Sequence, residues 1–274
     1  MENFQLSPFI EIDGIGAASG LVYLNDSLYI ISDNSLCLYN YNFSKKELNK
    51  ITLFGNQPEI AAKKDKPDFE SVTLFENKLY LFGSGSTKKR NTRVTYDLEN
   101  QEIKEKDLSK IYKRLAESSS ITDDDLNIEG AIITTETIYY FQRGNGANAQ
   151  NGIFCYDRNT KNVAFKPIPL PKINEIPSTF TDAILVEETI YFLAAAENTT
   201  STYNDGDIEG SVIGTIDLKT LNLKSVIQIS TYNKFEGLTF SKKSANEIEF
   251  LLCEDNDTEE LKSTIYLLKL FTEH

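Results

Sequence analysis

Residues 69–86 read FESVTLFENKLYLFGSGS, and four other segments of the chain repeat their layout. Each copy opens on a polar residue, called the anchor below, which is followed by an apolar run and then by an aromatic residue nine to fourteen positions after the anchor. The anchors are Ser19, Glu70, Glu129, Asp182 and Glu236. Neighbouring anchors are 51, 59, 53 and 54 residues apart, a period typical of propeller blades rather than helical repeats.

Within each repeat, short segments of alternating apolar and polar residues lie between Gly, Asn, Asp and Ser turns, a pattern that predicts β-strands. The first four repeats supply four strands each, and the fifth supplies three. Residues 4–12 precede the first repeat and have no partner there, so we expect them to form the outer strand of the fifth blade and close the ring. The sequence predicts an all-β, five-bladed β-propeller with four antiparallel strands per blade, a single domain of residues 1–274.

The charge and hydrophobicity of the chain limit the kinds of binding partner that we expect. The net charge of −13 and a pI near 4.7 argue against nucleic acid, which requires a basic surface. No apolar run approaches membrane-spanning length, and the first residues do not resemble a signal peptide. Cys37, Cys155 and Cys253 are scattered in apolar segments, which suits free thiols. We therefore expect a cytoplasmic monomer that binds neither nucleic acid nor membrane.

Three connections are too long to be turns: residues 55–69, 108–128 and 197–210. Residues 109–117 have helical spacing, with Ser109 as the expected N-cap. Asp97, Asp157 and Asp217 recur at the turn between the third and fourth strands, where an Asp side chain caps a tight turn. We assign these three a structural role.

The only histidine is His274. Its position at the end of the chain argues against a Ser-His-Asp arrangement and against zinc held by histidines. A site in this protein must be built from carboxylates, amides, hydroxyls and a few Arg or Lys side chains.

In a propeller, the innermost strands all begin around one mouth of the central channel, and four of the five anchors are carboxylates. Confined like charges repel unless a proton or a cation balances them. Oxygen ligands alone suit Ca²⁺ first and Mg²⁺ second, so the five anchors are candidate metal ligands. The alternative is that these carboxylates accept backbone N–H bonds from neighbouring blades and only hold the ring together.

The ends of the second strands should reach the same mouth, and they are strongly polar. They contribute Asp33, Ser84, Arg143, Glu197 and Asp255, with Arg90 and Arg93 a few residues after Ser84. Arg beside a carboxylate-held cation is suited to an anionic ligand. We expect Asp33, Ser84, Arg90, Arg93, Arg143 and Asp255 to contact the ligand, while Arg143 is equally suited to be an internal counter-ion of the ring.

Two pairs of motifs and one further motif carry a resemblance. Phe69-Glu70-Ser71 with the Gly-Ser-Gly-Ser loop, Asn127-Ile128-Glu129-Gly130 with Arg143-Gly144-Asn145, and Phe235-Glu236-Gly237-Leu238 together resemble an uncharacterised family of bacterial β-propeller proteins. More distantly, the anchors resemble those of five-bladed calcium-activated nucleotidases (apyrases), and the Glu-Gly-Leu starts resemble esterase-like phytase propellers. The resemblance to the nucleotidases implies Ca²⁺ in the channel, held by Ser19, Glu70, Glu129 and Glu236.

Two hypotheses follow from these patterns. The first is a propeller that binds a small anionic ligand at a Ca²⁺ site in its mouth, with metal-dependent hydrolysis of phosphoesters as the reaction if it is an enzyme. The second is a non-enzymatic scaffold that binds a protein partner and uses the acidic ring only structurally. The sequence assigns no catalytic residue.

Overall fold

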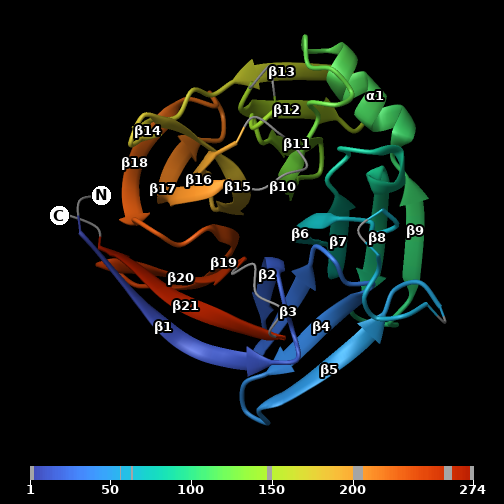
Figure 1. Cartoon of the computed structure of the whole chain (residues 1–274), viewed down its shortest axis with the longest axis vertical. Coiled ribbons are helices and arrows are strands. Elements are labelled where there is room, and N and C mark those ends of the chain that lie inside the picture. Colours follow the sequence, from blue (N-terminus) through green and yellow to red (C-terminus); the bar gives the residue numbers. More distant parts are fainter. Residues whose placement is uncertain are drawn as a thin grey trace.

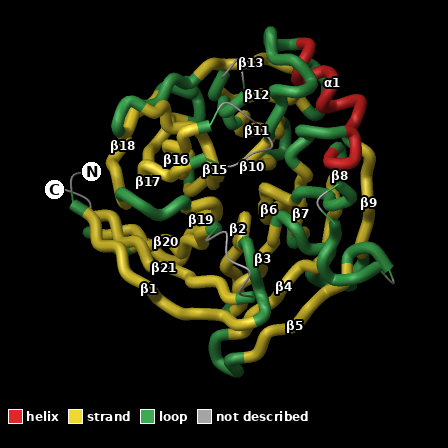
Figure 2. Tube along the Cα trace, in the orientation of Figure 1, coloured by secondary structure: helices red, strands yellow, loops and turns green. Residues whose placement is uncertain are grey.

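The computed structural model describes residues 3–55, 57–62, 64–146, 150–199, 206–255 and 261–271. Within these ranges, five antiparallel sheets stand around a common axis as the blades of a propeller (Figure 1), which confirms the predicted fold class. The tube in Figure 2 shows strands throughout the ring and the helix α1 (Ser109–Glu117) at its edge. None of the described helices is long and apolar enough to cross a membrane.

The strands run from the axis outward in sequence order in the first four blades. Their bounds are β2 (Ala18–Leu24), β3 (Ser27–Ser32), β4 (Cys37–Asn42) and β5 (Glu47–Thr52); β6 (Phe69–Phe75), β7 (Lys78–Gly83), β8 (Thr92–Asp97) and β9 (Ile103–Asp107); β10 (Ile128–Ile133), β11 (Thr137–Gln142), β12 (Gly152–Asp157) and β13 (Val163–Pro167); and β15 (Ile176–Val186), β16 (Thr189–Asn198), β17 (Asp207–Asp217) and β18 (Leu223–Ser230).

The fifth blade closes the ring with the N-terminal strand, as the sequence predicts. It consists of β19 (Phe235–Lys243), β20 (Glu247–Glu254), β21 (Lys262–Phe271) and, outermost, β1 (Phe4–Asp13). The pairing of β1 with β21 runs from Phe4 opposite Leu270 to Asp13 opposite Lys262. Figure 1 shows β1 and β21 side by side in this blade. Hydrogen bonds between the two ends of the chain therefore hold the ring shut.

Several details differ from the sequence-based prediction. The connection predicted at residues 197–210 is shorter, because β16 extends to Asn198 and β17 begins at Asp207. A short strand, β14 (Lys172–Ile173), pairs with the start of β15. The helix α1 (Ser109–Glu117) has the predicted bounds, but Ser109 is its first helical residue, and the Asp107 carboxylate accepts the Ser109 N–H bond at 2.8 Å.

The predicted role of the turn aspartates is confirmed. Asp97, Asp157 and Asp217 each accept backbone N–H bonds from the residues that follow them, at 2.8–3.3 Å. These bonds fix the outer hairpins. Apolar side chains fill the five spaces between neighbouring blades, so each sheet is covered on both faces.

Each innermost strand carries a β-bulge near its start, and the bulge defines the true anchor position. The extra residue is Ser19 in β2, Glu70 in β6, Glu129 in β10 and Glu236 in β19. In β15 it is Thr181, because the register shifts between Phe180 and Asp182. The sequence-based alignment of the fourth repeat was therefore wrong by one residue, and Asp182 follows the anchor.

The hydroxyl anchors connect neighbouring blades. Ser19 Oγ donates to the Phe69 carbonyl at 2.5 Å, and Thr181 Oγ1 donates in the same way to the Phe235 carbonyl at 2.6 Å. The Asp182 carboxylate accepts the Leu238 N–H of the next blade at 2.8 Å and the Ala183 N–H at 2.7 Å. Asp182 thus accepts an interblade backbone hydrogen bond, the structural role that the sequence left open for the carboxylates, and Ser19 bonds to the next blade as a donor.

Replacing Thr181 with Val tests the importance of these interblade bonds. Val has nearly the same shape, but it leaves the buried Phe235 carbonyl without its donor. We expect the free energy of unfolding to fall by about 1–3 kcal/mol. Chemical denaturation measures this loss. Thr135→Val, on an exposed turn, is the matched control, and equal stability of the two variants would contradict the assignment.

Candidate functional site

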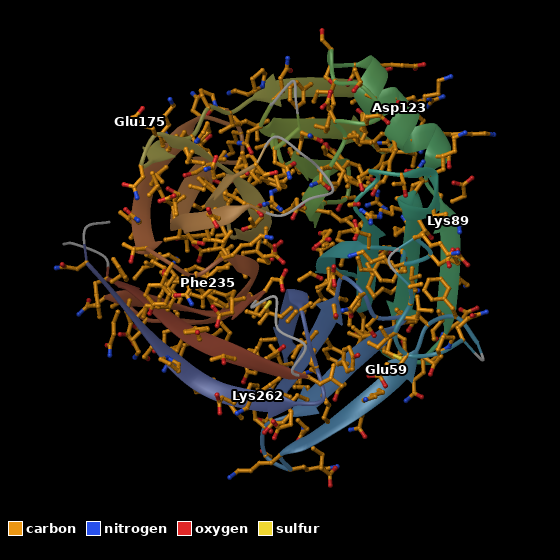
Figure 3. The ribbon with its side chains drawn as sticks, in the orientation of Figure 1. Glu59, Lys89, Asp123, Glu175, Phe235 and Lys262 are labelled. Atoms are coloured by element: carbon orange, nitrogen blue, oxygen red, sulfur yellow. The ribbon has the colours of Figure 1, made fainter. Side chains whose placement is uncertain are left out.

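Charged side chains gather where the innermost strands begin. Figure 3 shows side chains filling the spaces between blades, with Phe235, the neighbour of an anchor, on the inner side and Asp123, Glu175 and Lys262 at the periphery. We call the charged group at this end of the channel the mouth cluster. Its described members are Asp33, Lys66, Asp68, Glu70, Arg90, Glu129, Arg143, Glu197, Lys234 and Glu236.

The third blade satisfies its anchor with a donor two residues upstream. Asn127 Nδ2 donates to Glu129 Oε1 at 2.7 Å, and Arg143 Nη1 lies 3.3 Å from the same oxygen. The second amino group of Arg143 bonds to Glu197. Burial raises the pKa of Glu129 to about 7, although the guanidinium of Arg143 acts in the opposite direction. Arg143 is therefore an internal counter-ion of the ring, one of the two roles that the sequence allowed.

The fifth blade uses the same arrangement with a lysine. Lys234 Nζ lies 2.9 Å from Glu236 Oε1 and 3.9 Å from Glu197 Oε2. Burial raises the pKa of the Glu236 carboxyl, while Lys234 and Arg143 lower it. Both Glu129 and Glu236 thus receive a donor from the residue two positions before them.

The second blade has an acid at that upstream position. Asp68 precedes Glu70 by two residues, and its carboxylate is fully engaged elsewhere: Arg90 Nη1 lies at 2.7 Å, Lys66 Nζ at 2.8 Å, and Ser84 Oγ donates at 2.5 Å. Lys66 also forms an ion pair with Asp33. Asp68 therefore adds a negative charge beside Glu70 and donates nothing to it.

Glu70 is the exception among the acidic anchors. It makes no hydrogen bond or ion pair with any other residue that the structure describes. Burial raises the pKa of its carboxyl well above the usual range, and Asp68, Glu129, Glu236 and Asp33 raise it further. Oxygen atoms of Asp33, Asp68 and Glu70 lie within 4.8 Å of one another. These three side chains form a compact set of oxygen ligands.

The charges of the mouth cluster do not balance. Among the described residues it contains six carboxyl groups and four cationic side chains. Full ionisation would leave two uncompensated negative charges in a poorly solvated space, which is costly. A bound proton or a bound cation relieves this repulsion, and Glu70 is the carboxyl group of the cluster for which no described residue provides a counter-charge by direct contact.

Most of the predicted site residues meet at the mouth. Asp33, Ser84, Arg90, Arg143 and the three glutamate anchors are brought together there. The N–H of Asp255 donates to the Lys234 carbonyl at 3.3 Å, and its carboxylate raises the pKa of Lys234, so it lies at the same end.

Arg93 lies elsewhere. Its guanidinium stacks over the Tyr80 ring, 5.1 Å from the centroid. Its positive charge partly opposes the rise in pKa that burial causes for the hydroxyls of Tyr112 and Tyr140. Arg90 belongs to the short 3-10 helix η1 (Lys88–Arg90), whereas Arg93 belongs to β8. The two residues between them turn Arg93 into the space between the second and third blades, so its position does not support its prediction as a ligand contact.

Four members of the mouth region were not predicted from the sequence: Lys66, Asp68, Asn127 and Lys234. Three of them had a signal. Asp68, Asn127 and Lys234 each stand two residues before a glutamate anchor, in Asp-Phe-Glu, Asn-Ile-Glu and Lys-Phe-Glu. Lys66 lies on the long connection before β6 and belongs to no repeated pattern.

The raised pKa of Glu70 predicts a dependence of stability on pH. The folded protein holds this proton more tightly than the unfolded chain, so the contribution is fully present below about pH 4.5 and is lost as pH rises toward the folded-state pKa. Glu70→Gln lacks this loss. We therefore expect the stability of Glu70→Gln relative to the wild type to increase between pH 5 and 8 in chelator, measured by denaturation at each pH.

Glu136→Gln, on an exposed turn, is the control and should keep a constant difference. If the stability difference between Glu70→Gln and the wild type were also constant with pH, the pKa of Glu70 would not be raised in the folded protein.

Comparison with solved structures supports the fold. The chain is similar to the glutaminyl cyclase of Myxococcus xanthus, with 10 % identity, a TM-score of 0.57, and 98 % of this chain and 97 % of that one covered. It is also similar to the PQQ-bound aldose sugar dehydrogenase of Streptomyces coelicolor, with 10 % identity, a TM-score of 0.55, and 97 % and 98 % covered. At this identity the likeness concerns the fold alone.

Comparison with curated proteins gives no match. A family model does match, over residues 14–270, and its description is a family of unknown function, DUF6929. Because the match spans nearly the whole chain, the protein belongs to this family.

Proposed function

We propose that the mouth cluster is a receptor for a divalent cation, Ca²⁺ first, together with a small anionic ligand. The observation that carries this proposal is the carboxyl of Glu70, which has no hydrogen-bond or ion-pair partner among the described residues and lies beside Asp33 and Asp68, with oxygens of all three within 4.8 Å. Ca²⁺ takes oxygen ligands from irregular sets of carboxylates more readily than Mg²⁺ does. The proposed ligands are therefore Asp33, Asp68 and Glu70, a smaller set than the five anchors.

The anchors divide between two tasks in this proposal. Ser19, Thr181 and Asp182 are committed to bonds with the next blade. Glu129 and Glu236 already have cationic partners at 3.3 and 2.9 Å, and they contribute negative potential rather than direct ligation. Among the acidic anchors, Glu70 is the one without a partner in the part of the chain that the structure describes, which argues for a cation site on one side of the mouth instead of on the axis.

Hydrolysis of a phosphoester is the reaction that this arrangement would support. A divalent cation polarises a bound water and stabilises charge that develops on a phosphoryl oxygen. Arg90 is 5 % exposed and lies beside Asp68, so it is suited to hold a phosphate oxygen. A screen of simple phosphomonoesters and phosphodiesters with Ca²⁺ or Mg²⁺ tests this step. Activity in the wild type that is lost in Glu70→Gln would support it.

Thermal melts test the cation site itself. A cation that binds only the folded protein at one hundred times its dissociation constant adds about 2.7 kcal/mol, which corresponds to a rise in Tm of roughly 5–10 °C. We expect Ca²⁺ to raise the Tm of the wild type in this way and to have no effect on Glu70→Gln. Glu136→Gln should respond like the wild type.

An unchanged Tm in the wild type, with no metal found by elemental analysis, would contradict the cation site. Binding to a protein partner through the polar face would then be the next function to test.

A further inference from the structure

A cation already lies among the three carboxylates. Lys66 is 8 % exposed, and its ammonium forms ion pairs with both Asp33 and Asp68, at 2.8 Å in the second case. Glu70 raises its pKa as well. The side chain of Lys66 therefore occupies the place that a free cation would take, as a counter-ion tethered to the chain.

Arg90 completes this arrangement. It lies 2.7 Å from Asp68 Oδ2 and donates to Ser86 Oγ, also at 2.7 Å. Together Lys66 and Arg90 form ion pairs with Asp33 and Asp68, whereas Glu70 has no ion pair with any described residue. Both side chains donate hydrogen bonds to carboxylates that a divalent cation would also need as ligands.

We propose that these ion pairs exchange on binding: a divalent cation takes Asp33, Asp68 and Glu70, and Lys66 and Arg90 turn to the phosphate group of the ligand. The inference rests on the proposed function and narrows the ligand to a small molecule with a phosphate group that itself coordinates the cation. Lys66 is then the residue that determines specificity, because it disfavours the cation when no phosphate is present.

The physical reason is competition for the same oxygens. Lys66 and a metal ion cannot both lie between Asp33 and Asp68, and their like charges repel. The flexible four-carbon stem of lysine lets the ammonium move to a phosphate nearby. A bound phosphate thus draws Lys66 away from the carboxylates that the cation needs. A bound cation in turn releases Lys66 from those carboxylates to bind the phosphate. Such coupling is reciprocal and is typically about 5-fold to 150-fold in affinity.

The first test uses the wild-type protein with Ca²⁺ and inorganic phosphate at concentrations below precipitation. Titration calorimetry measures Ca²⁺ affinity without phosphate and at saturating phosphate, and then phosphate affinity without and with Ca²⁺. We expect each ion to tighten the binding of the other by about 5-fold or more. Ca²⁺ affinity that does not depend on phosphate would overturn the exchange.

The second test uses Lys66→Met, with Lys89→Met as the matched control. Lys89 is 63 % exposed and pairs with Asp65, so its loss removes the same charge from the neighbourhood of the cluster without touching it. We expect Lys66→Met to bind Ca²⁺ alone about 10-fold more tightly and to lose the effect of phosphate. Lys89→Met should behave like the wild type.

The outcomes separate the two proposals. If the wild type binds Ca²⁺ and Lys66→Met binds it equally or more weakly, the exchange is wrong and the cation site stands. If neither protein binds Ca²⁺, with or without phosphate, the cation site is wrong and the exchange fails with it. Should Lys66→Met not fold, the coupling measured in the wild type decides the question alone.

Discussion

Closing five sheets into one ring forces five strand starts into a single narrow mouth, and every polar group placed there must be satisfied from within. The blades meet this constraint differently. Ser19 and Thr181 donate to the carbonyl of the next blade, and Glu129 and Glu236 receive a proton donor from two residues upstream. In the second blade, the upstream residue is Asp68, and Glu70 has no described partner.

This difference makes an otherwise repetitive structure asymmetric. Four blades have their bulge residue engaged in hydrogen bonds or ion pairs, which costs little because the partners lie just before the same strand or in the next blade. The second blade places the carboxyl of Glu70 beside those of Asp33 and Asp68. Lys66 and Arg90 form ion pairs with Asp33 and Asp68 only. The side of the mouth formed by the first two blades is therefore where a carboxyl group is available to bind a cation.

Much of this could be predicted from the sequence, because repetition averages out local ambiguity. The strand pattern, the closure by residues 4–12 and three glutamate anchors follow from five copies of one layout. The fourth anchor was misassigned because Thr181 and Asp182 are both polar and the acid matched its neighbours. Tyr191 lies ten residues after Thr181, the spacing of Tyr29, Tyr80 and Tyr139 from their anchors. That spacing identifies the bulge residue. Lys66 was beyond reach, since it lies on a connection that occurs once and only the fold brings it to Asp33 and Asp68.

The most direct measurement is a crystal structure of the protein with Ca²⁺, or with Mn²⁺ to provide an anomalous signal. The account predicts one peak at the mouth, about 2.3–2.6 Å from oxygens of Asp33, Asp68 and Glu70 for Ca²⁺, with the Lys66 ammonium moved away from Asp33. An ordered mouth with no peak and Lys66 still between Asp33 and Asp68, at a cation concentration that saturates known calcium proteins, would contradict it. A peak held instead by Glu129 and Glu236 on the axis would contradict the assignment of Glu70 as the free ligand.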